Sequence, residues 1–251
     1  MPAAVAVAVA FDVDGTLVDT ERDGHRVAFN RAFSELGVDR TWDVEHYGRL
    51  LAIPGGRRRL DHDLAAAGLP ETERADLVVR LHERKTELFV EMAESGLLTP
   101  RSGVTALIDG LRAAGARLGV ATTGSGAWVH QLLDRLFPDR FDEIVTSDEA
   151  PRLKPHPQAY TVVLQRLGVA PDACVAIEDS AAGLRAACGA GLRCAVVVNG
   201  YTRDQALQAA DLVVDGFEPT AAVLADPHGL HPRRGLDVET VLRLLPARGS
   251  A

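Results

Sequence analysis

The feature that most constrains the fold is an apolar, valine-rich run near the N-terminus that ends in two acids. Residues 5–11 are apolar throughout, as is typical of a strand that is buried on both faces. Asp12 and Asp14 follow at once, and Gly15 and Thr16 turn the chain. Side chains two apart lie on the same side of an extended chain, so both acids face the same way. We predict a central strand that carries both acids at its carboxyl end, where open α/β sheets bind their ligands.

Two carboxylates this close repel each other, so such a pair usually binds a cation, shares a proton or divides two chemical roles. The alternative interpretation is a hydrated turn after the strand. The flanking strand and three later motifs, described below, favour a functional pair.

Composition excludes several classes of protein. The chain has 251 residues, 47% of them hydrophobic and 25% charged, with a net charge of −8. An acidic chain is a poor general partner for nucleic acid or an anionic membrane. Three cysteines without CxxC spacing argue for a reducing compartment, and against a disulfide framework or a structural zinc. With no signal peptide or spanning segment recognised, we expect a cytoplasmic monomer with no membrane or nucleic-acid partner.

The chain changes character after the first acids. Residues 20–94 show helical spacing and no convincing strand, whereas strands and helices alternate from residue 98 onward. Alternation of this kind predicts a parallel sheet covered on both faces, interrupted by a helical insert. The predicted boundaries are 1–20 and 96–225 for the α/β core, 21–95 for the insert and 226–251 for a tail with a short helix. Strands are expected at 117–121, 141–146, 173–177, 194–198 and 212–214.

Three further motifs follow predicted strands or lie in a loop. Thr122 and Thr123 follow the strand at 117–121, Lys154 lies among closely spaced prolines, and Glu178 and Asp179 follow the strand at 173–177. Each motif has an ordinary explanation: a helix N-cap, a surface loop and a solvated turn. Together with the first acids they fit a phosphoryl-transfer site, which needs a nucleophile, an acid/base, cations on the phosphoryl oxygens and usually a metal.

The residue types suggest individual roles. Asp12 would attack phosphorus and become an aspartyl-phosphate, and Asp14 would serve as acid and then as base. Thr122, neighbouring backbone N–H groups and Lys154 would hold the phosphoryl oxygens. Oxygen-rich sites of this kind suit Mg²⁺. Its candidate ligands are Asp12, Asp179, Glu178 and the backbone carbonyl of Asp14, with Glu178 acting directly or through water.

These motifs resemble those of the haloacid-dehalogenase-type (HAD) phosphohydrolases. Residues 12–17, Asp-Val-Asp-Gly-Thr-Leu, match the DxDGT[LV] signature, and residues 154–160 match a KPxPxxY loop in full. A strand-end Thr and a Glu-Asp pair stand in the expected order. The resemblance implies a Rossmann-like parallel core, a helical cap inserted after the first motif, Mg²⁺ dependence and the roles given above. Haloacid dehalogenases proper lack the second acid, so Asp14 argues against that activity.

The insert resembles the cap of the CbbY-type sugar-bisphosphate phosphatases at residues 20–25, 28–30, 42–47 and 55–59. The resemblance implies that the cap closes over the phosphate site and chooses the substrate. The substrate-binding residues that it implies are Glu21, Tyr47, Gly55, Gly56, Arg57 and Arg59, together with Thr122, Thr123 and Lys154. In this interpretation the two arginines hold a second phosphate; the alternative for three successive arginines is a solvated helix start. The chain departs from the family pattern at Gly124, where relatives often carry Ser or Thr.

The predicted function is therefore Mg²⁺-dependent hydrolysis of a small phosphorylated sugar, with a ketose bisphosphate such as xylulose 1,5-bisphosphate as the expected substrate. One alternative is a phosphotransferase like β-phosphoglucomutase, which shares all four core motifs. The other is a catalytically silent binding protein of the same fold, which would be expected to lack one of the core groups.

Overall fold

The structure, a computed structural model, describes residues 7–53, 55–232 and 235–245. The chain divides into two compact units: Thr20–Leu98 forms a helical unit, and the segments before and after it form an α/β unit.

The α/β unit is built on one sheet with β1 at its centre. Within the described residues the strand order is β3-β2-β1-β4-β5-β6-β7. The strands are β1 (Ala8–Phe11), β2 (Arg117–Ala121), β3 (Glu143–Val145), β4 (Cys174–Glu178), β5 (Arg193–Val197), β6 (Leu212–Val214) and β7 (Val223–Ala225). The first six are parallel, which confirms the predicted fold class, whereas β7 pairs antiparallel with β6. The sequence prediction missed β7 because all three of its residues are exposed at the sheet edge.

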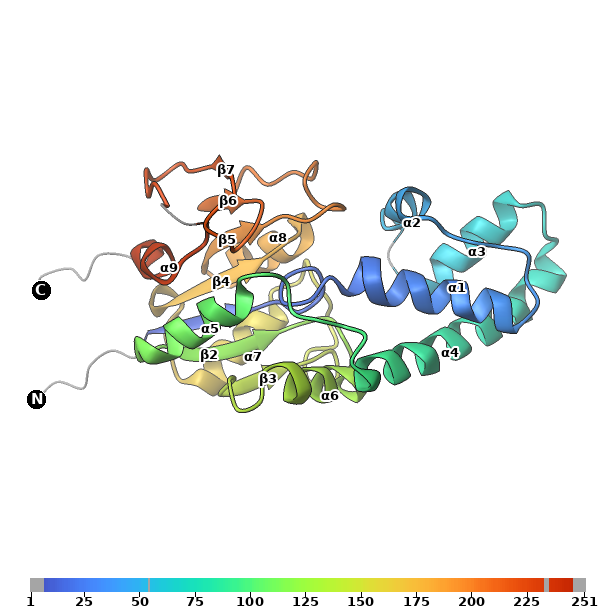
Figure 1. Cartoon of the computed structure of the whole chain (residues 1–251), viewed down its shortest axis with the longest axis horizontal. Helices are drawn as coiled ribbons and strands as arrows, with labels where there is room; N and C mark the ends of the chain where they lie inside the picture. The colour runs from blue at the N-terminus through green and yellow to red at the C-terminus, as the bar shows by residue number, and fades with distance from the viewer. Residues whose placement is uncertain (1–6, 54, 233–234, 246–251) are drawn as a thin grey trace, which may run out of the picture. The chain divides into compact units, whose positions relative to one another are not determined.

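Helices cover both faces of the sheet (Figure 1). They are α5 (Val104–Ala113), α6 (Gly126–Leu136), α7 (Gln158–Leu167), α8 (Ala181–Gly189) and α9 (Val238–Leu244), with a 3₁₀ turn at Pro171–Ala173. Ala8 and Ala10 of β1 pack in one cluster with α7 and α8, while α5 contacts α9. Because both faces are covered, β1 is fully buried, which explains its uninterrupted apolar sequence.

The register of β1 and β4 decides where the first acids lie. Phe11 is the register partner of both Val120 and Ile177, and the N–H of Asp12 donates to the Ile177 carbonyl at 3.0 Å. The strands therefore end level with one another, which brings Asp12 beside the end of β4.

The helical unit, called the cap below, packs around aromatic side chains. It contains a π-helical turn (Thr20–His25), α1 (Arg26–Glu35), α2 (Val44–Leu50), α3 (Gly56–Ala66) and α4 (Glu71–Ser95). Helix α4 packs on both α1 and α3. Phe29, Phe33, Trp42 and Tyr47 are almost completely buried, and their rings contact one another. This aromatic cluster supplies a large part of the cap's apolar core.

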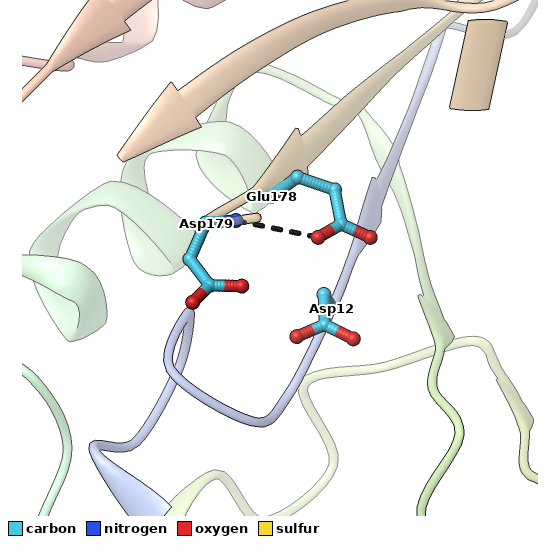
Figure 2. A group of neighbouring side chains, drawn as sticks. All are labelled: Asp12, Glu178 and Asp179. Carbon is cyan, nitrogen blue, oxygen red and sulfur yellow. Dashed lines mark hydrogen bonds between the residues drawn. The ribbon is translucent and has the colours of Figure 1, made fainter. Parts of the chain in front are cut away.

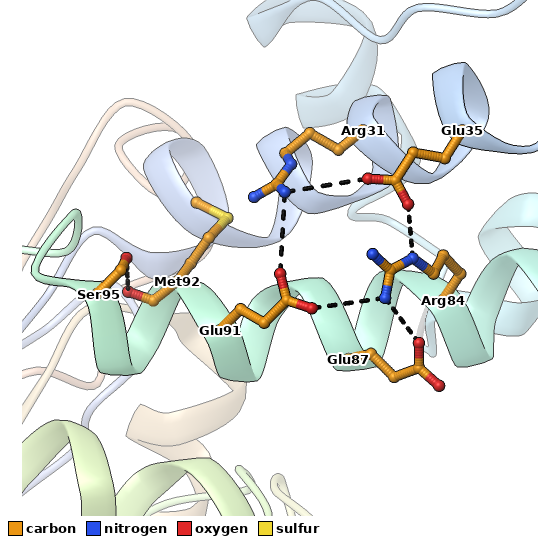
Figure 3. Close-up of polar contacts among 7 residues, drawn as sticks. All are labelled: Arg31, Glu35, Arg84, Glu87, Glu91, Met92 and Ser95. Atoms are coloured by element: carbon orange, nitrogen blue, oxygen red, sulfur yellow. Dashed lines mark hydrogen bonds and ion pairs between the residues drawn. The ribbon is translucent and has the colours of Figure 1, made fainter.

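An ionic network lies across α1 and α4 (Figure 3). Arg84 Nε lies 2.6 Å from Glu35 and its NH1 lies 2.8 Å from Glu87, while Arg31 NH2 lies 3.8 Å from Glu91. These side chains are partly exposed, so each pair contributes little to stability. Their alternating charges instead favour one register of α1 along α4.

No helix in the described part of the chain is both long and apolar enough to span a membrane.

Candidate active site

The predicted core residues lie together at the carboxyl-terminal ends of the parallel strands. Asp12 follows β1, Thr122 follows β2, Lys154 lies in the loop between β3 and α7, and Glu178 and Asp179 stand at the end of β4. All of these strands are parallel, so their carboxyl ends lie at the same end of the sheet. Residues that are far apart in the sequence thereby become neighbours.

Three carboxylates form a compact buried cluster (Figure 2). Asp12, Glu178 and Asp179 each offer an oxygen, and these oxygens all lie within 4.8 Å of one another. Their exposed fractions are 5%, 0% and 5%. Like charges held this close in a buried site need compensation by cations or donors.

Lys154 supplies one positive charge to this cluster. Its Nζ donates to Asp12 Oδ1 at 2.5 Å and to Glu178 Oε1 at 2.6 Å. The hydroxyl of Tyr160 donates to the same Glu178 oxygen at 2.6 Å. Burial by itself would lower the pKa of Lys154, but the charges of Asp12 and Glu178 outweigh it and raise that pKa. Lys154 is therefore a fixed cation at neutral pH.

A single lysine does not balance three carboxylates. Burial first, and then the charge of Asp12, raises the pKa of Asp179 well above its ordinary value. Burial likewise raises the pKa of Glu178, against the opposing effect of Lys154. Buried carboxylate oxygens with surplus negative charge are a donor set that suits Mg²⁺, a hard cation with oxygen ligands. The residues present thus fit a magnesium ion, because Asp12, Glu178 and Asp179 each offer a carboxylate oxygen.

The structure shows how Glu178 is engaged. Its Oε1 accepts from Lys154 and Tyr160, whereas among the described residues its Oε2 accepts a single, long hydrogen bond of 3.3 Å from the N–H of Asp179. Oε2 is therefore the oxygen better placed to serve a metal, either directly or through water.

Two residues that the sequence analysis did not select support the cluster. Asn199 Nδ2 donates to Asp179 Oδ2 at 2.7 Å. Arg101 donates to the carbonyls of Gly15, Val197 and Val198 at 2.6, 2.9 and 2.8 Å. Arg101 thus ties the loop after β1 to the end of β5. Neither residue belongs to a local motif, so only the folded chain reveals these contacts.

The loop between Asp12 and Val18 is tight. The N–H of Gly15 donates to the Val18 carbonyl at 2.8 Å, and Gly15 has φ +84°, which favours glycine. A Cβ at position 15 would overlap the Asp179 carboxylate. Asp14, in the same loop, is half-buried.

In the loop after β2, Thr122 is not the N-cap of the following helix. Thr122 Oγ1 accepts from the N–H of Gly124 at 3.0 Å, and the N-cap of α6 is Ser125. Thr122 is 1% exposed, whereas Thr123 is half-buried. The departure at Gly124 has a packing reason, because a Cβ there would overlap the ring of Trp128. Trp128 thus takes the space of the Ser or Thr side chain that the resemblance led us to expect.

Three of the predicted cap residues form a second polar cluster, called the cap triad below. The Tyr47 hydroxyl donates to Glu21 Oε2 at 2.5 Å, and Arg59 NH1 lies 3.4 Å from that hydroxyl and 3.9 Å from Glu21 Oε1. Arg59 Nε also donates to the Ile53 carbonyl at 2.9 Å. The Arg59 side chain is 13% exposed, so its charge is held in one place.

The other predicted cap residues, Arg57, Gly55 and Gly56, lie at the start of α3. The Arg57 side chain is 55% exposed, and its NH2 lies 3.9 Å from Glu83 on α4. Gly55 has φ +91° and is the N-cap of α3, and Gly56 is the first residue of that helix. The Arg57 side chain is therefore largely solvated at the start of α3, whereas the Arg59 side chain lies within the cap triad.

The cap also carries a histidine whose titration is testable. Burial, followed by the positive charges of Lys85 and Arg57, lowers the pKa of His82 to about 4. The folded cap therefore binds this proton more weakly than the unfolded chain, whose histidine pKa is about 6.5. Stability from neutral His82 is present above pH 6.5 and is lost as the pH falls toward 4.

We expect His82→Gln to flatten this part of the pH dependence. Between pH 7 and pH 4.5, protonation of His82 should lower the free energy of unfolding of the wild type by on the order of 1 kcal/mol, a small value because the ring is partly exposed and screened. His82→Gln should remove this loss. Urea unfolding at the two pH values measures it. His62→Gln, at an exposed histidine of α3, is the control and should keep the wild-type slope. Equal slopes for wild type and His82→Gln would contradict the assignment.

Comparison with known proteins agrees with this geometry. Residues 7–191 match the family model of the haloacid dehalogenase-like hydrolases. The chain belongs to this family. It is 43% identical over 219 residues to the protein CbbY of Cereibacter sphaeroides, covering 84% of this chain and 92% of that protein. It is 42% identical over 217 residues to a CBBY-like protein of Arabidopsis thaliana, covering 83% and 68%.

Solved structures show the same fold. CbbY from Rhodobacter sphaeroides, crystallised as a mutant in complex with xylulose-(1,5)bisphosphate, superposes with a TM-score of 0.71 at 41% identity, covering 85% of this chain and 95% of that one. A β-phosphoglucomutase from Clostridium difficile superposes with a TM-score of 0.65 at 25% identity, covering 85% and 92%. A phosphorylated carbohydrates phosphatase of Thermotoga maritima is 32% identical over 186 residues, covering 74% of this chain and 82% of that protein. The family and this relative support a phosphatase that acts on a phosphorylated sugar.

Proposed function

We propose that this chain is a Mg²⁺-dependent phosphatase of a ketose bisphosphate, with xylulose 1,5-bisphosphate as the preferred substrate. The observation that carries the proposal is the buried cluster of Asp12, Lys154, Glu178 and Asp179. The likeness to a CbbY that binds this sugar bisphosphate supports the choice of substrate.

In the first step, a carboxylate oxygen of Asp12 attacks phosphorus and the bond to the sugar oxygen breaks. Lys154 already binds Oδ1, so Oδ2 is the oxygen that we assign to the attack. Asp14 gives its proton to the departing sugar oxygen. The products of this step are the free hydroxyl and an aspartyl-phosphate at Asp12.

In the second step, Asp14, now ionised, takes a proton from water as that water attacks phosphorus. The acyl-phosphate bond breaks, inorganic phosphate leaves and Asp12 regains its carboxylate. Lys154 and Thr122 stabilise the charge on the phosphoryl oxygens. A magnesium ion held by Asp12 and Asp179, with the Asp14 carbonyl and Glu178, would supply further positive charge to these oxygens when bound.

The cap triad is proposed to recognise the rest of the substrate. Glu21 accepts hydrogen bonds from sugar hydroxyls, and Arg59 holds the phosphate that is not transferred by charge-assisted hydrogen bonds. Tyr47 ties these two side chains together, because its hydroxyl contacts both.

We expect Arg59→Ala to lower kcat/KM for the bisphosphate by about 10- to 100-fold more than for a monophosphate. Losing a hydrogen bond to a charged group costs about 1.5–3 kcal/mol. Steady-state kinetics with both substrates measures the ratio. Arg58→Ala, at the exposed neighbouring arginine, is the control and should leave the ratio unchanged. Equal losses on both substrates would remove Arg59 from the second phosphate.

Phosphate release across a substrate panel tests the proposed function. The panel contains xylulose 1,5-bisphosphate, ribulose 1,5-bisphosphate, fructose 1,6-bisphosphate, β-glucose 1-phosphate and simple monophosphates, with and without Mg²⁺. A strong, Mg²⁺-dependent preference for one pentulose bisphosphate supports the proposal. Flat, weak hydrolysis of every compound contradicts the proposed substrate class.

The likeness to β-phosphoglucomutase keeps a second candidate open. Formation of glucose 6-phosphate from β-glucose 1-phosphate, with little free phosphate, would identify a phosphotransferase instead. The monomeric state and cytoplasmic location stay predictions of the sequence.

A further inference from the structure

We propose that Asp63, on α3, is a positioning residue that holds α2 so that the cap triad keeps the geometry needed to recognise the sugar bisphosphate. The proposal rests on the proposed function of the triad. It concerns a residue outside every motif that the sequence analysis selected.

Asp63 stands out by its burial. Among the described residues, four acidic side chains are buried: three form the carboxylate cluster, and the fourth is Asp63, which is 5% exposed. A buried carboxylate is costly unless donors satisfy it. Its presence in the cap therefore calls for a structural or functional reason.

Donors from two neighbouring parts of the cap satisfy this carboxylate. The indole N–H of Trp42 donates to Oδ2 at 2.9 Å, and His46 Nε2 lies 2.7 Å from Oδ1. Arg40 Nε lies 3.6 Å from Oδ2. Asp63 thus links α3 to α2 and to the segment that precedes α2.

The contacts assign the proton on His46. Arg49 NH2 lies 3.4 Å from His46 Nδ1, and a guanidinium can only donate, so Nδ1 accepts. Nε2 then carries the hydrogen and donates to Asp63.

The link lies directly beside the cap triad. His46 precedes Tyr47 on α2, and the ring of Trp42 packs 5.7 Å from the Tyr47 ring. Arg59 and Asp63 are four residues apart on α3, and side chains at this spacing share one face of a helix. The same two helices thus carry both the link and the triad.

Stability alone is a weak reason to keep this group. Replacing buried ionic groups by apolar ones of similar volume is often neutral or stabilising. The directional bonds of Asp63 instead specify how α2 lies against α3, and Tyr47 has to reach Glu21 from α2. A shift of α2 would misplace the Tyr47 hydroxyl, which contacts both Glu21 and Arg59.

The test compares Asp63→Ala with wild type on xylulose 1,5-bisphosphate and on p-nitrophenyl phosphate, which lacks a sugar and a second phosphate. We expect KM for the bisphosphate to rise by about tenfold or more, with a much smaller change in kcat. The preference over p-nitrophenyl phosphate should fall by about the same factor. Asp61→Asn is the matched control, because Asp61 lies on the same helix and pairs with Arg74 at 2.5 Å but is exposed. It should keep the wild-type preference.

Two further variants separate positioning from general damage. Trp42→Phe removes one donor to Asp63 while keeping an aromatic ring, and it should reproduce part of the loss of preference. This variant supplies the test if Asp63→Ala does not fold. In an Arg59→Ala background, Asp63→Ala should change KM for the bisphosphate less than twofold, because the triad through which it acts is already broken.

The outcomes are distinct. Wild-type preference retained in both Asp63→Ala and Trp42→Phe, or a full additional loss in the Arg59→Ala background, overturns the positioning role. If wild type itself shows no preference for a sugar bisphosphate, the proposed function fails instead. In that case hydrogen exchange of the α2 amides tests whether Asp63 holds α2 in place. Faster exchange in Asp63→Ala but not in Asp61→Asn supports this role, and equal rates overturn it.

Discussion

Asp12→Asn is expected to lower kcat by at least about 10⁴-fold on every phosphorylated substrate. An amide oxygen is a poor nucleophile, and Asp12 is the residue proposed to form the covalent intermediate, so its loss should cost more than any other single change. The fold should be retained, because Asn has nearly the same shape and one fewer negative charge enters the cluster with Glu178 and Asp179. Phosphate release and thermal unfolding of the same preparation measure the two effects.

The control for this variant is chemical. Mass spectrometry has to show that the amide introduced by Asp12→Asn has not hydrolysed back to a carboxylate, which would restore activity. Trapping by acid should yield a phosphorylated wild-type enzyme and an unphosphorylated Asp12→Asn variant. Substantial turnover by the intact variant would assign the nucleophile to another residue.

Lys154→Met is expected to have the second-largest effect, with two separate consequences. Losing the cation proposed to stabilise charge on the phosphoryl oxygens should lower kcat/KM by about 10²- to 10³-fold. The folded protein should also lose about 3–5 kcal/mol without Mg²⁺, because Asp12 and Glu178 keep their buried charges without their partner. Denaturant unfolding measures this loss.

Added Mg²⁺ separates the two consequences. We expect it to restore part of the stability of Lys154→Met, because a bound cation compensates the same carboxylates, but not the activity. Arg152→Met is the matched control: it alters an exposed cation of the same loop and should change neither quantity appreciably. Stability equal to wild type without Mg²⁺ would show that Lys154 does not compensate the cluster.

Local pattern was sufficient for most of the fold. The apolar run before Asp12 predicted a buried central strand, and the structure places β1 between β2 and β4. Strand predictions at 117–121 and 212–214 agree with β2 and β6. Patterns of this kind succeed because burial on both faces demands a continuous apolar strand. The edge strand β7 has no such demand, and the prediction missed it.

The candidate site residues also divide into features that local sequence predicts and features that it does not. The sequence by itself determined which chemical groups stand at the strand ends, since Asp12, Thr122, Glu178 and Asp179 follow directly from strand boundaries. It also determined the order of the motifs that carries the family resemblance. These properties are local, and strand ends can be recognised from a few neighbouring residues.

Only the tertiary structure decided how these groups are compensated and held. Lys154 and Tyr160 meet at one oxygen of Glu178, and Asn199 reaches Asp179, across long separations in sequence. It also distinguished Arg59, whose side chain is 13% exposed, from Arg57, whose side chain is 55% exposed, although the sequence treated them alike. The physical reason is that burial and hydrogen-bond partners depend on distant segments packed against a residue, and spacing along the chain carries no record of them.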